Sequence, residues 1–305
     1  MDLLVSLVTN DTSRSQSVAE LTENKYFTRS WSSMYHAIHN FYCKRQEESV
    51  NRPQLRDKER KKIADYLIEK IVKKDQSINS MIIDITSNSK KHSAKAADRT
   101  FILNHSVPEP GHEYSVVCVA NTAPWAVPVS IERVRSSDNK YQKACEQVIG
   151  IAKQTTDKTL NIVTGDSAYS TNKFIGPLHD HANLVTITRQ RTNRTIYDPF
   201  VDPQKQKGRK RVYGKKLDKL TSADYTETHT EDSKKGIITI KISEYKDRLV
   251  KSSKGNTMTK KKLNFIKVEV FDHNGKKKYK RDLWLCVSGK KKNQVSAKEA
   301  YLYYK

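Results

Sequence analysis

Cysteine is scarce in this sequence, and its four copies lie far apart, at Cys43, Cys118, Cys145 and Cys286. No two of them form a C-x-x-C pair, which argues against a zinc ribbon or a disulfide framework. We therefore expect reduced thiols, as in a cytosolic protein.

Long apolar segments are also lacking. No stretch approaches the roughly 20 apolar residues that a membrane span requires. The first residues, MDLLVSLV, have neither the basic start nor the long apolar run of a secretory signal. No repeat of fixed period is visible. These absences predict a soluble, cytoplasmic protein with no part embedded in a membrane.

Negative charge is in deficit. Lys and Arg number 57 against 34 Asp and Glu, which gives a formal net charge of +23 and a pI near 9.7. Solubility needs far less, and phosphate backbones are the commonest target of such an excess. Nucleic acid is the favoured partner on charge alone. Membrane surfaces, acidic proteins and simply solvated lysines remain open at this point.

The 305 residues are 36% hydrophobic, enough for a core in one large domain or in two to three smaller ones. Residues 1–78 predict a helical module, because aromatic and aliphatic residues recur at helical spacing through 27–41 and a second amphipathic stretch covers 57–74. We assign this module to DNA binding, and helices that only pack on one another are the alternative.

The period changes after residue 80, where the sequence predicts a mixed α/β sheet flanked by helices. Three strands are followed by a helix, a strand, a second helix and a further strand. The expected strands are 81–86, 114–120, 125–134, 161–166 and 184–188, and the expected helices are 139–153 and 171–181.

A lysine-dense segment, 195–281, predicts a β-rich insertion with strands at 236–244 and 263–272 and a turn at Asn274 and Gly275. Core-like sequence resumes at 282–287, and a final helix is expected after Ser296. The predicted parts are thus 1–78, 79–194, 195–281 and 282–305.

Two aspartates lie within apolar, strand-like runs. Asp84 interrupts the run 81–85, and Asp166 ends the run 160–166. A carboxylate there is costly to desolvate unless a cation or a donor meets it. Neighbouring strands would bring both carboxylates to one divalent-metal site. The alternatives are an ordinary edge-strand aspartate for Asp84 and a Gly-Asp turn for Asp166.

The sequence resembles the DDE-type transposases of bacterial insertion sequences, in the cut-and-paste group whose catalytic core carries a β-strand insertion. The resemblance covers roughly residues 80–305. It rests on IIDIT with the following ADRTF, on IVTGDSAY, on LVTITRQRTNR and on LWL, which are residues 82–86, 97–101, 162–169, 184–194 and 283–285.

This resemblance implies an RNase H-like fold and a three-carboxylate site for two Mg²⁺ or Mn²⁺ ions, with Asp84 and Asp166 as catalytic metal ligands. The implied partners are DNA, namely transposon terminal inverted repeats and target DNA, and a second copy of the chain in a homodimeric synaptic complex.

The third carboxylate of the family follows a Tyr, two residues, an Arg and three further residues. If Tyr304 is that Tyr, the Arg and the Glu fall beyond Lys305, so the resemblance implies a C-terminally truncated transposase. Glu299 follows Ser296 by three residues, and we interpret it as part of a helix capping box rather than as the missing ligand.

Candidate DNA contacts follow the sheet strands. Arg189, Arg191 and Arg194 alternate with uncharged residues just past a strand, and a solvated basic turn is the alternative. The lysine tracts are expected to give salt-sensitive affinity rather than sequence choice. Trp284 is expected to pack in the core, or else to stack on a base flipped from a DNA end, as related transposases do; Tyr304 is a similar candidate.

The sequence therefore predicts a DNA transposase, a metal-dependent endonuclease and strand transferase, with activity impaired by the missing carboxylate. The alternatives are a non-catalytic DNA-binding remnant and another RNase H-like nuclease, such as a resolvase-type enzyme.

Overall fold

The computed structural model describes residues 62, 65, 66, 68, 69, 71, 72, 77–89, 100–104, 107–122, 125–191, 194–201, 211–218, 221–233, 236–251, 258 and 261–305. The chain divides into two compact units, residues 1–66 and 67–305. The expected N-terminal module lies almost entirely outside the described residues. The second unit contains every strand and helix discussed below.

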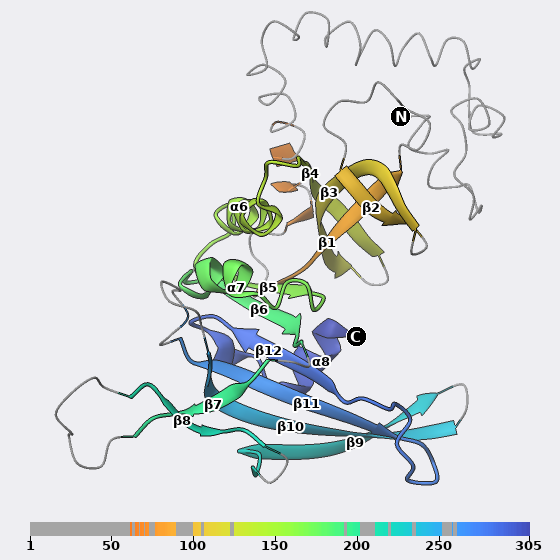
Figure 1. Cartoon of the computed structure of the whole chain (residues 1–305), viewed down its shortest axis with the longest axis vertical. Coiled ribbons are helices and arrows are strands. Elements are labelled where there is room, and N and C mark those ends of the chain that lie inside the picture. Colours follow the sequence, from red (N-terminus) through yellow and green to blue (C-terminus); the bar gives the residue numbers. More distant parts are fainter. Residues whose placement is uncertain are drawn as a thin grey trace, which may run out of the picture. The chain divides into compact units, whose positions relative to one another are not determined.

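The second unit is built on a mixed sheet to which the described residues contribute twelve strands (Figure 1). Its strands run in the order β2-β3-β1-β5-β6-β12-β11-β10-β7-β8, while β4 pairs with β3 and β9 with β10. The first six are β1 (Ile78–Ser89), β2 (Thr100–Asn104), β3 (Val107–Thr122), β4 (Trp125–Val134), β5 (Leu160–Gly165) and β6 (Leu184–Arg189).

The order β4-β3-β1-β5-β6 is that of an RNase H-like core. β1 pairs antiparallel with β3 and parallel with β5, which pairs parallel with β6. β5 is buried along its whole length, as expected for a central parallel strand, whereas β1 alternates buried Met81 and Ile83 with exposed Ile82 and Asp84. The predicted α/β, RNase H-like fold is confirmed.

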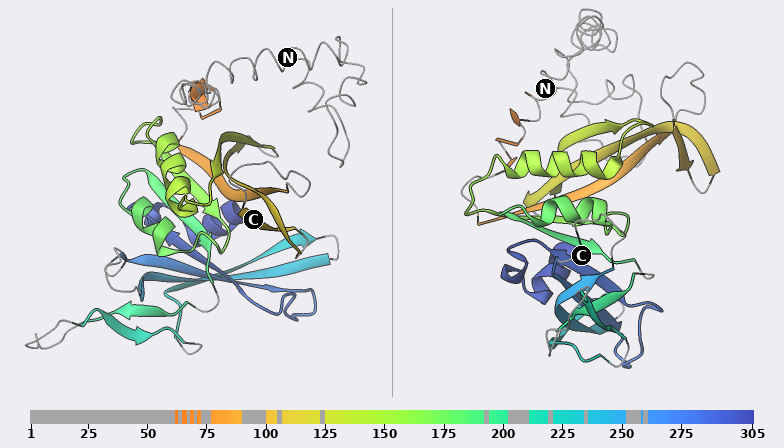
Figure 2. Two further views of the ribbon diagram at one scale, coloured as in Figure 1. Left: turned by 45° about the horizontal axis from the view of Figure 1, so that its top comes forward. Right: turned by 60° about the vertical axis from the view of Figure 1, so that its left-hand side comes forward.

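Helices cover the two faces of this core (Figure 2). On one face, α6 (Lys140–Ala152) and α7 (Asn172–His179) pack with Ile83 and Val163 in one hydrophobic cluster, and we call it the α6/α7 face. On the other, α8 (Ala297–Tyr304) packs with Ile162 and Ile187, and we call it the α8 face. Both clusters follow the period of two along each strand.

Capping residues set the helix starts. Asn139 accepts hydrogen bonds from the N–H groups of Tyr141 and Gln142 and so begins α6. Ser296 and Glu299 form the predicted capping box of α8. The structural interpretation of Glu299 is therefore confirmed.

The expected order of elements needs one correction in the core, because β2 adds a fourth strand before the first helix. The sequence also did not reveal β7 (Ile196–Pro199), β8 (Tyr213–Lys216) and β9 (Tyr225–Ser233). β9 reads YTETHTEDS and has no apolar face, so pattern alone does not mark it as a strand. It pairs with β10 (Gly236–Val250), whose own side chains supply the buried surface.

The insertion strands continue the core sheet rather than forming a separate layer. β12 (Leu283–Ser288) pairs antiparallel with β6, and β11 (Leu263–Phe271) pairs with β12 and β10. The predicted turn after β11 is confirmed: Gly275 has φ +74° and its N–H donates to the carbonyl of Asp272 at 2.9 Å.

The described cysteines are unpaired thiols. Burial raises the pKa of Cys145 and of Cys286 to about 12. Cys43 lies outside the described residues. Among the helices that the structure describes, none is both long enough and apolar enough to cross a membrane.

Candidate active site

Asp84 and Asp166 lie side by side at one edge of the sheet. The last register pair between β1 and β5 is Ile83 with Gly165, and each aspartate is the next residue of its own chain segment. Parallel strands are about 4.8 Å apart, so the two carboxylates reach the same small volume. Asp84 continues the row of Ile82, opposite to Ile83, and therefore belongs to the α8 face.

Each carboxylate keeps one oxygen free of hydrogen bonds from the described residues. Oδ1 of Asp84 accepts a hydrogen bond from the N–H of Ile85 at 2.8 Å, and Oδ1 of Asp166 accepts one from the N–H of Ala168 at 2.8 Å. Among the same residues, neither carboxylate forms an ion pair. Both side chains are exposed. Two neighbouring acids without a basic partner repel each other until a cation binds.

Tyr169 packs near this pair; the sequence included it in the IVTGDSAY match but gave it no role. Its side chain is 1% exposed and makes edge contacts with Tyr141 and Phe174 at ring-centroid distances of 6.2 Å and 4.9 Å. Burial raises the pKa of Tyr169, and the charges of Asp84 and Asp166 raise it further, which places its hydroxyl close to both acids.

Gly165 is what lets Tyr169 pack there. A Cβ on Gly165 would lie 3.2 Å from two atoms of Tyr169 and 3.3 Å from Ile83 Cγ2. Contacts this short require the neighbours to move. In IVTGDSAY, the glycine thus leaves space for the Tyr169 ring, and the aspartate that follows it is one of the two acids.

Arg189 and Tyr304 extend the row of acids on the α8 face. Thr188 pairs with Gly165, so Arg189 follows Asp166 across the next strand, and its side chain is exposed. Burial raises the pKa of Tyr304, while Arg189 lowers it and Asp166 raises it. The end of α8 therefore brings the Tyr304 hydroxyl near both charged groups.

Arg191 and Arg194 turn back onto the loop that follows Asp166. Nε of Arg191 donates to the carbonyl of Ser167 at 3.0 Å. Arg194 donates to the carbonyl of Ser170 and to Oδ1 of Asn172. These bonds hold the loop in place, so of the three predicted arginines Arg189 is the one whose side chain makes no hydrogen bond or ion pair among the described residues.

Trp284 is half-buried and packs against the edge of the hydrophobic core cluster that contains Tyr245, as its core interpretation predicted. Its ring stacks on Tyr245 with a centroid distance of 5.5 Å and an interplanar angle of 27°. Both rings line a pocket of about 740 Å³ at the junction of the core and the insertion. Basic side chains share its wall, namely Arg191, Arg194, Lys216, Lys267 and Lys277, together with Asp218 and Asp282.

A third carboxylate does not join the pair within the part of the chain that the structure describes, where no three His, Cys, Asp or Glu side chains gather. Glu299 is engaged elsewhere, since Oε2 accepts from the N–H and the hydroxyl of Ser296 at 2.8 Å and 2.7 Å. Asp98 and Arg99, quoted in the family resemblance, lie outside the described residues.

A comparison with known protein families finds one matching family model for this chain. The family model of the DDE superfamily endonucleases matches residues 3–245. The chain belongs to this family. The match spans both aspartates and ends within β10, so Trp284 and Tyr304 lie outside it. A comparison with curated proteins finds no match.

The acid pair of this DDE superfamily endonuclease fits a divalent cation. Carboxylate oxygens are the ligands that Mg²⁺ and Mn²⁺ prefer, and Oδ2 of Asp84 and of Asp166 makes no hydrogen bond within the described part of the chain. The mutual repulsion of the two side chains would be relieved by a cation between them. These two residues would hold the metal.

Proposed function

We infer that this chain is a transposase-type DDE nuclease, which binds the ends of a DNA element and cleaves and joins DNA strands. The observation that carries this proposal is the register of β1 and β5, which brings two exposed carboxylates together. Family membership supplies the coarser activity, DNA cleavage. Transposition, terminal repeats and a homodimeric complex are the finer proposal.

The roles of the residues follow from their positions. Asp84 and Asp166 would hold divalent cations, which supply activation of a water or 3′-hydroxyl and stabilisation of the leaving oxygen. Arg189, exposed beside Asp166, would contact a DNA phosphate. The Tyr304 hydroxyl would donate a hydrogen bond to the same phosphate. Arg191 and Arg194 would hold the loop 167–172 and so keep Asp166 in place.

The pocket around Trp284 supports a role in holding DNA during cleavage. An aromatic ring at the rim of a basic pocket can stack on any unpaired base, because every base has a π-face. We propose that Trp284 contacts a base there, with Tyr245 supporting the opposite face of the indole ring. The stacked geometry of the two rings supports this assignment.

Two carboxylates hold divalent metal less firmly than three. Because the described residues supply two at this edge, we expect these 305 residues to bind DNA more readily than they cleave it. A DNA-binding protein without cleavage is therefore the second candidate function.

The test combines two readouts on one set of variants. The first is nicking of supercoiled plasmid in Mn²⁺. The second is backbone cleavage of the protein itself by Fe²⁺ and ascorbate, in which a bound ion cuts the chain next to its ligands. We expect protein fragments that end near residues 84 and 166, and nicking that falls on the order of 100-fold or more in Asp84→Asn and Asp166→Asn.

Asp157→Asn is the matched control, because Asp157 is an exposed aspartate in the loop that precedes β5, at the far end of the strand from Asp166. It should change neither readout. Trp284→Ala in the same assay should reduce cleavage more than DNA binding. Fe²⁺ fragments without plasmid nicking would favour the DNA-binding alternative. Neither fragments nor nicking, in a protein that still binds DNA, would remove the metal site.

A further inference from the structure

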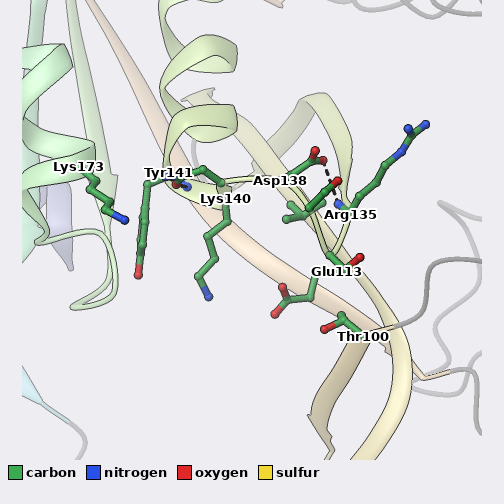
Figure 3. A pocket seen from close by; sticks show the side chains of 11 residues that line it. Thr100, Glu113, Arg135, Asp138, Lys140, Tyr141 and Lys173 are labelled. Atoms are coloured by element: carbon green, nitrogen blue, oxygen red, sulfur yellow. Dashed lines mark hydrogen bonds between the residues drawn. The ribbon is translucent and has the colours of Figure 1, made fainter.

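A second concave site lies on the other side of Tyr169 from the acid pair. It is a shallow, open pocket of about 450 Å³ at the turn between β4 and α6, and Lys173 at the start of α7 borders it. Nothing in the predicted site reaches it. Its principal side chains are Glu113, Asp138, Lys140, Tyr141 and Lys173 (Figure 3).

Lys140 and Lys173 are the cations that face this pocket. In Figure 3 they lie on either side of the Tyr141 ring, while Arg135 extends away from them. Among the described residues, neither lysine forms an ion pair or a side-chain hydrogen bond. Lys140 Nζ lies 5.8 Å from the centroid of Tyr141. The two ammonium groups are therefore available to an anion.

Lys143 and Asp138, which are close to Lys140 in the sequence, are already paired, and this sets Lys140 and Lys173 apart from Lys143. Lys143 pairs with Asp138 at 3.1 Å and with Glu132 at 3.7 Å. The N–H of Arg135 also donates to Asp138 at 2.9 Å, and this bond, with Lys143, lowers the pKa of Asp138. Asn139 accepts from the first N–H groups of α6, so an anion here would be held by side chains rather than by the helix end.

Contacts connect the pocket to the acid pair. Tyr141 packs edge-on against Tyr169, whose hydroxyl lies near Asp84 and Asp166. A polyanion that passes over the acids would thus meet Lys140 and Lys173 on the α6/α7 side and Arg189 on the α8 side.

We propose that this pocket is a DNA-backbone subsite, in which Lys140 and Lys173 hold a phosphate next to the strand positioned at the acid pair. The proposal rests on DNA as the substrate of the proposed function. Glu113 faces Lys140 across the pocket, and within the described structure its carboxylate makes no hydrogen bond or ion pair. It opposes the phosphate and limits the affinity of the subsite.

The experiment measures the salt dependence of binding to a short fluorescein-labelled duplex by anisotropy, with EDTA present so that no cleavage occurs. The double variant Lys140→Gln/Lys173→Gln should bind more weakly. Its plot of log K against log salt should be shallower than that of the unaltered chain by about 0.9 for each phosphate that the variant no longer neutralises.

The matched control is Lys153→Gln/Lys158→Gln. It removes the same charge from exposed lysines at the C-terminal end of α6 and in the loop before β5, at the opposite edge of the sheet. Its slope should remain that of the unaltered chain. Equal slopes for both double variants would overturn the proposal, because the lysines would then contribute only net charge.

Glu113→Gln removes a negative charge from the same pocket, so its effect on DNA binding should be opposite to that of the lysine variants. Removing the carboxylate should strengthen DNA binding, which a loss of local structure would not do. Weaker or unchanged binding would contradict a phosphate beside Glu113. Thermal melting of each variant checks that the fold is kept.

Acetylation of lysines with acetic anhydride, followed by mass spectrometry, tests the site in the unaltered chain. DNA should protect Lys140 and Lys173 and leave Lys153 and Lys158 reactive. Equal protection by inorganic phosphate alone would identify a site for small anions and overturn the backbone assignment. If the unaltered chain binds no DNA, the proposed function itself fails rather than this subsite.

Discussion

The acids at the carboxyl edge of the core and those of the insertion are treated in opposite ways by the fold. At the end of the insertion, Glu269 and the adjoining Asp282 share Lys267 and Lys277, with N–O distances from 2.7 Å to 3.3 Å. At the edge, Asp84 and Asp166 have each other and two backbone N–H groups. In a chain of net charge +23, cations were abundant for both places.

Paired acids stabilise the folded structure, whereas acids without a basic partner are available to bind a ligand. The acids of the insertion are neutralised within the sheet, so they gain nothing from a metal. The edge acids have no basic partner among the described residues, although Arg189 lies one strand away. Two exposed acids that adjacent strands bring together without a basic partner mark the candidate site better than the lysine tracts do.

The largest difference between the two regions should be the effect of a divalent metal on the stability of the protein. Addition of Mg²⁺ or Mn²⁺ should stabilise the unaltered chain, by about 2.7 kcal/mol at a metal concentration of 100 times the dissociation constant. Asp84→Asn and Asp166→Asn should abolish this gain, since each removes a ligand. Thermal unfolding with and without metal measures it.

Asp282→Asn is the control for that measurement, and its metal response should equal that of the unaltered chain. An absent response in Asp282→Asn, or a kept response in Asp166→Asn, would place the cation outside the acid pair.

Gly165→Ala should disturb the edge without altering any charge. The added methyl group would press on Tyr169 and Ile83 at 3.2–3.3 Å and should cost about 1–3 kcal/mol of unfolding free energy. Urea denaturation provides the value. Gly150→Ala is the matched control, because a Cβ there meets nothing within 4 Å and α6 should gain slightly. An unchanged midpoint for Gly165→Ala would mean that Tyr169 can shift freely.

Loss of one carboxylate in each region should have the smallest effect, and the two effects should differ in sign. Without metal, Asp166→Asn removes one of two repelling neighbours, so stability should stay the same or rise. Asp282→Asn leaves Lys267 and Lys277 with fewer partners and should cost about 1 kcal/mol. Urea denaturation in EDTA compares them, and a destabilising Asp166→Asn would mean that the acid pair is structural.

The core and its two acids could be predicted from sequence because local patterns encode them. Strand-like apolar runs gave β1, part of β3, β4, β5 and β6, and the capping box of Ser296 and Glu299 gave the start of α8. Asp84 and Asp166 were visible as charges inside such runs. The family resemblance then supplied the strand order that makes them neighbours.

The rest of the site depends on contacts between distant segments, which no local pattern contains. Tyr169 is three residues after Asp166, but its burial follows from Gly165 and from α6. The turn of Arg191 and Arg194 toward residues 167–172 cannot be read from alternation, which favoured phosphate contacts. Lys140 and Lys173 begin two different helices, and only the packing of α6 with α7 brings them to one pocket.

The ladder between β6 and β12 has a mechanical consequence. Leu285 pairs with Arg189 and Ser288 with Thr186. The insertion strands are therefore joined to the core strands by the same kind of backbone hydrogen bonds that join the core strands to one another. An arm joined in this way has no hinge at its root. Trp284, one residue from Leu285, therefore keeps a fixed offset from Asp166. Under the proposed function, this offset would set the distance along a DNA strand between the contact at Trp284 and the cleavage site.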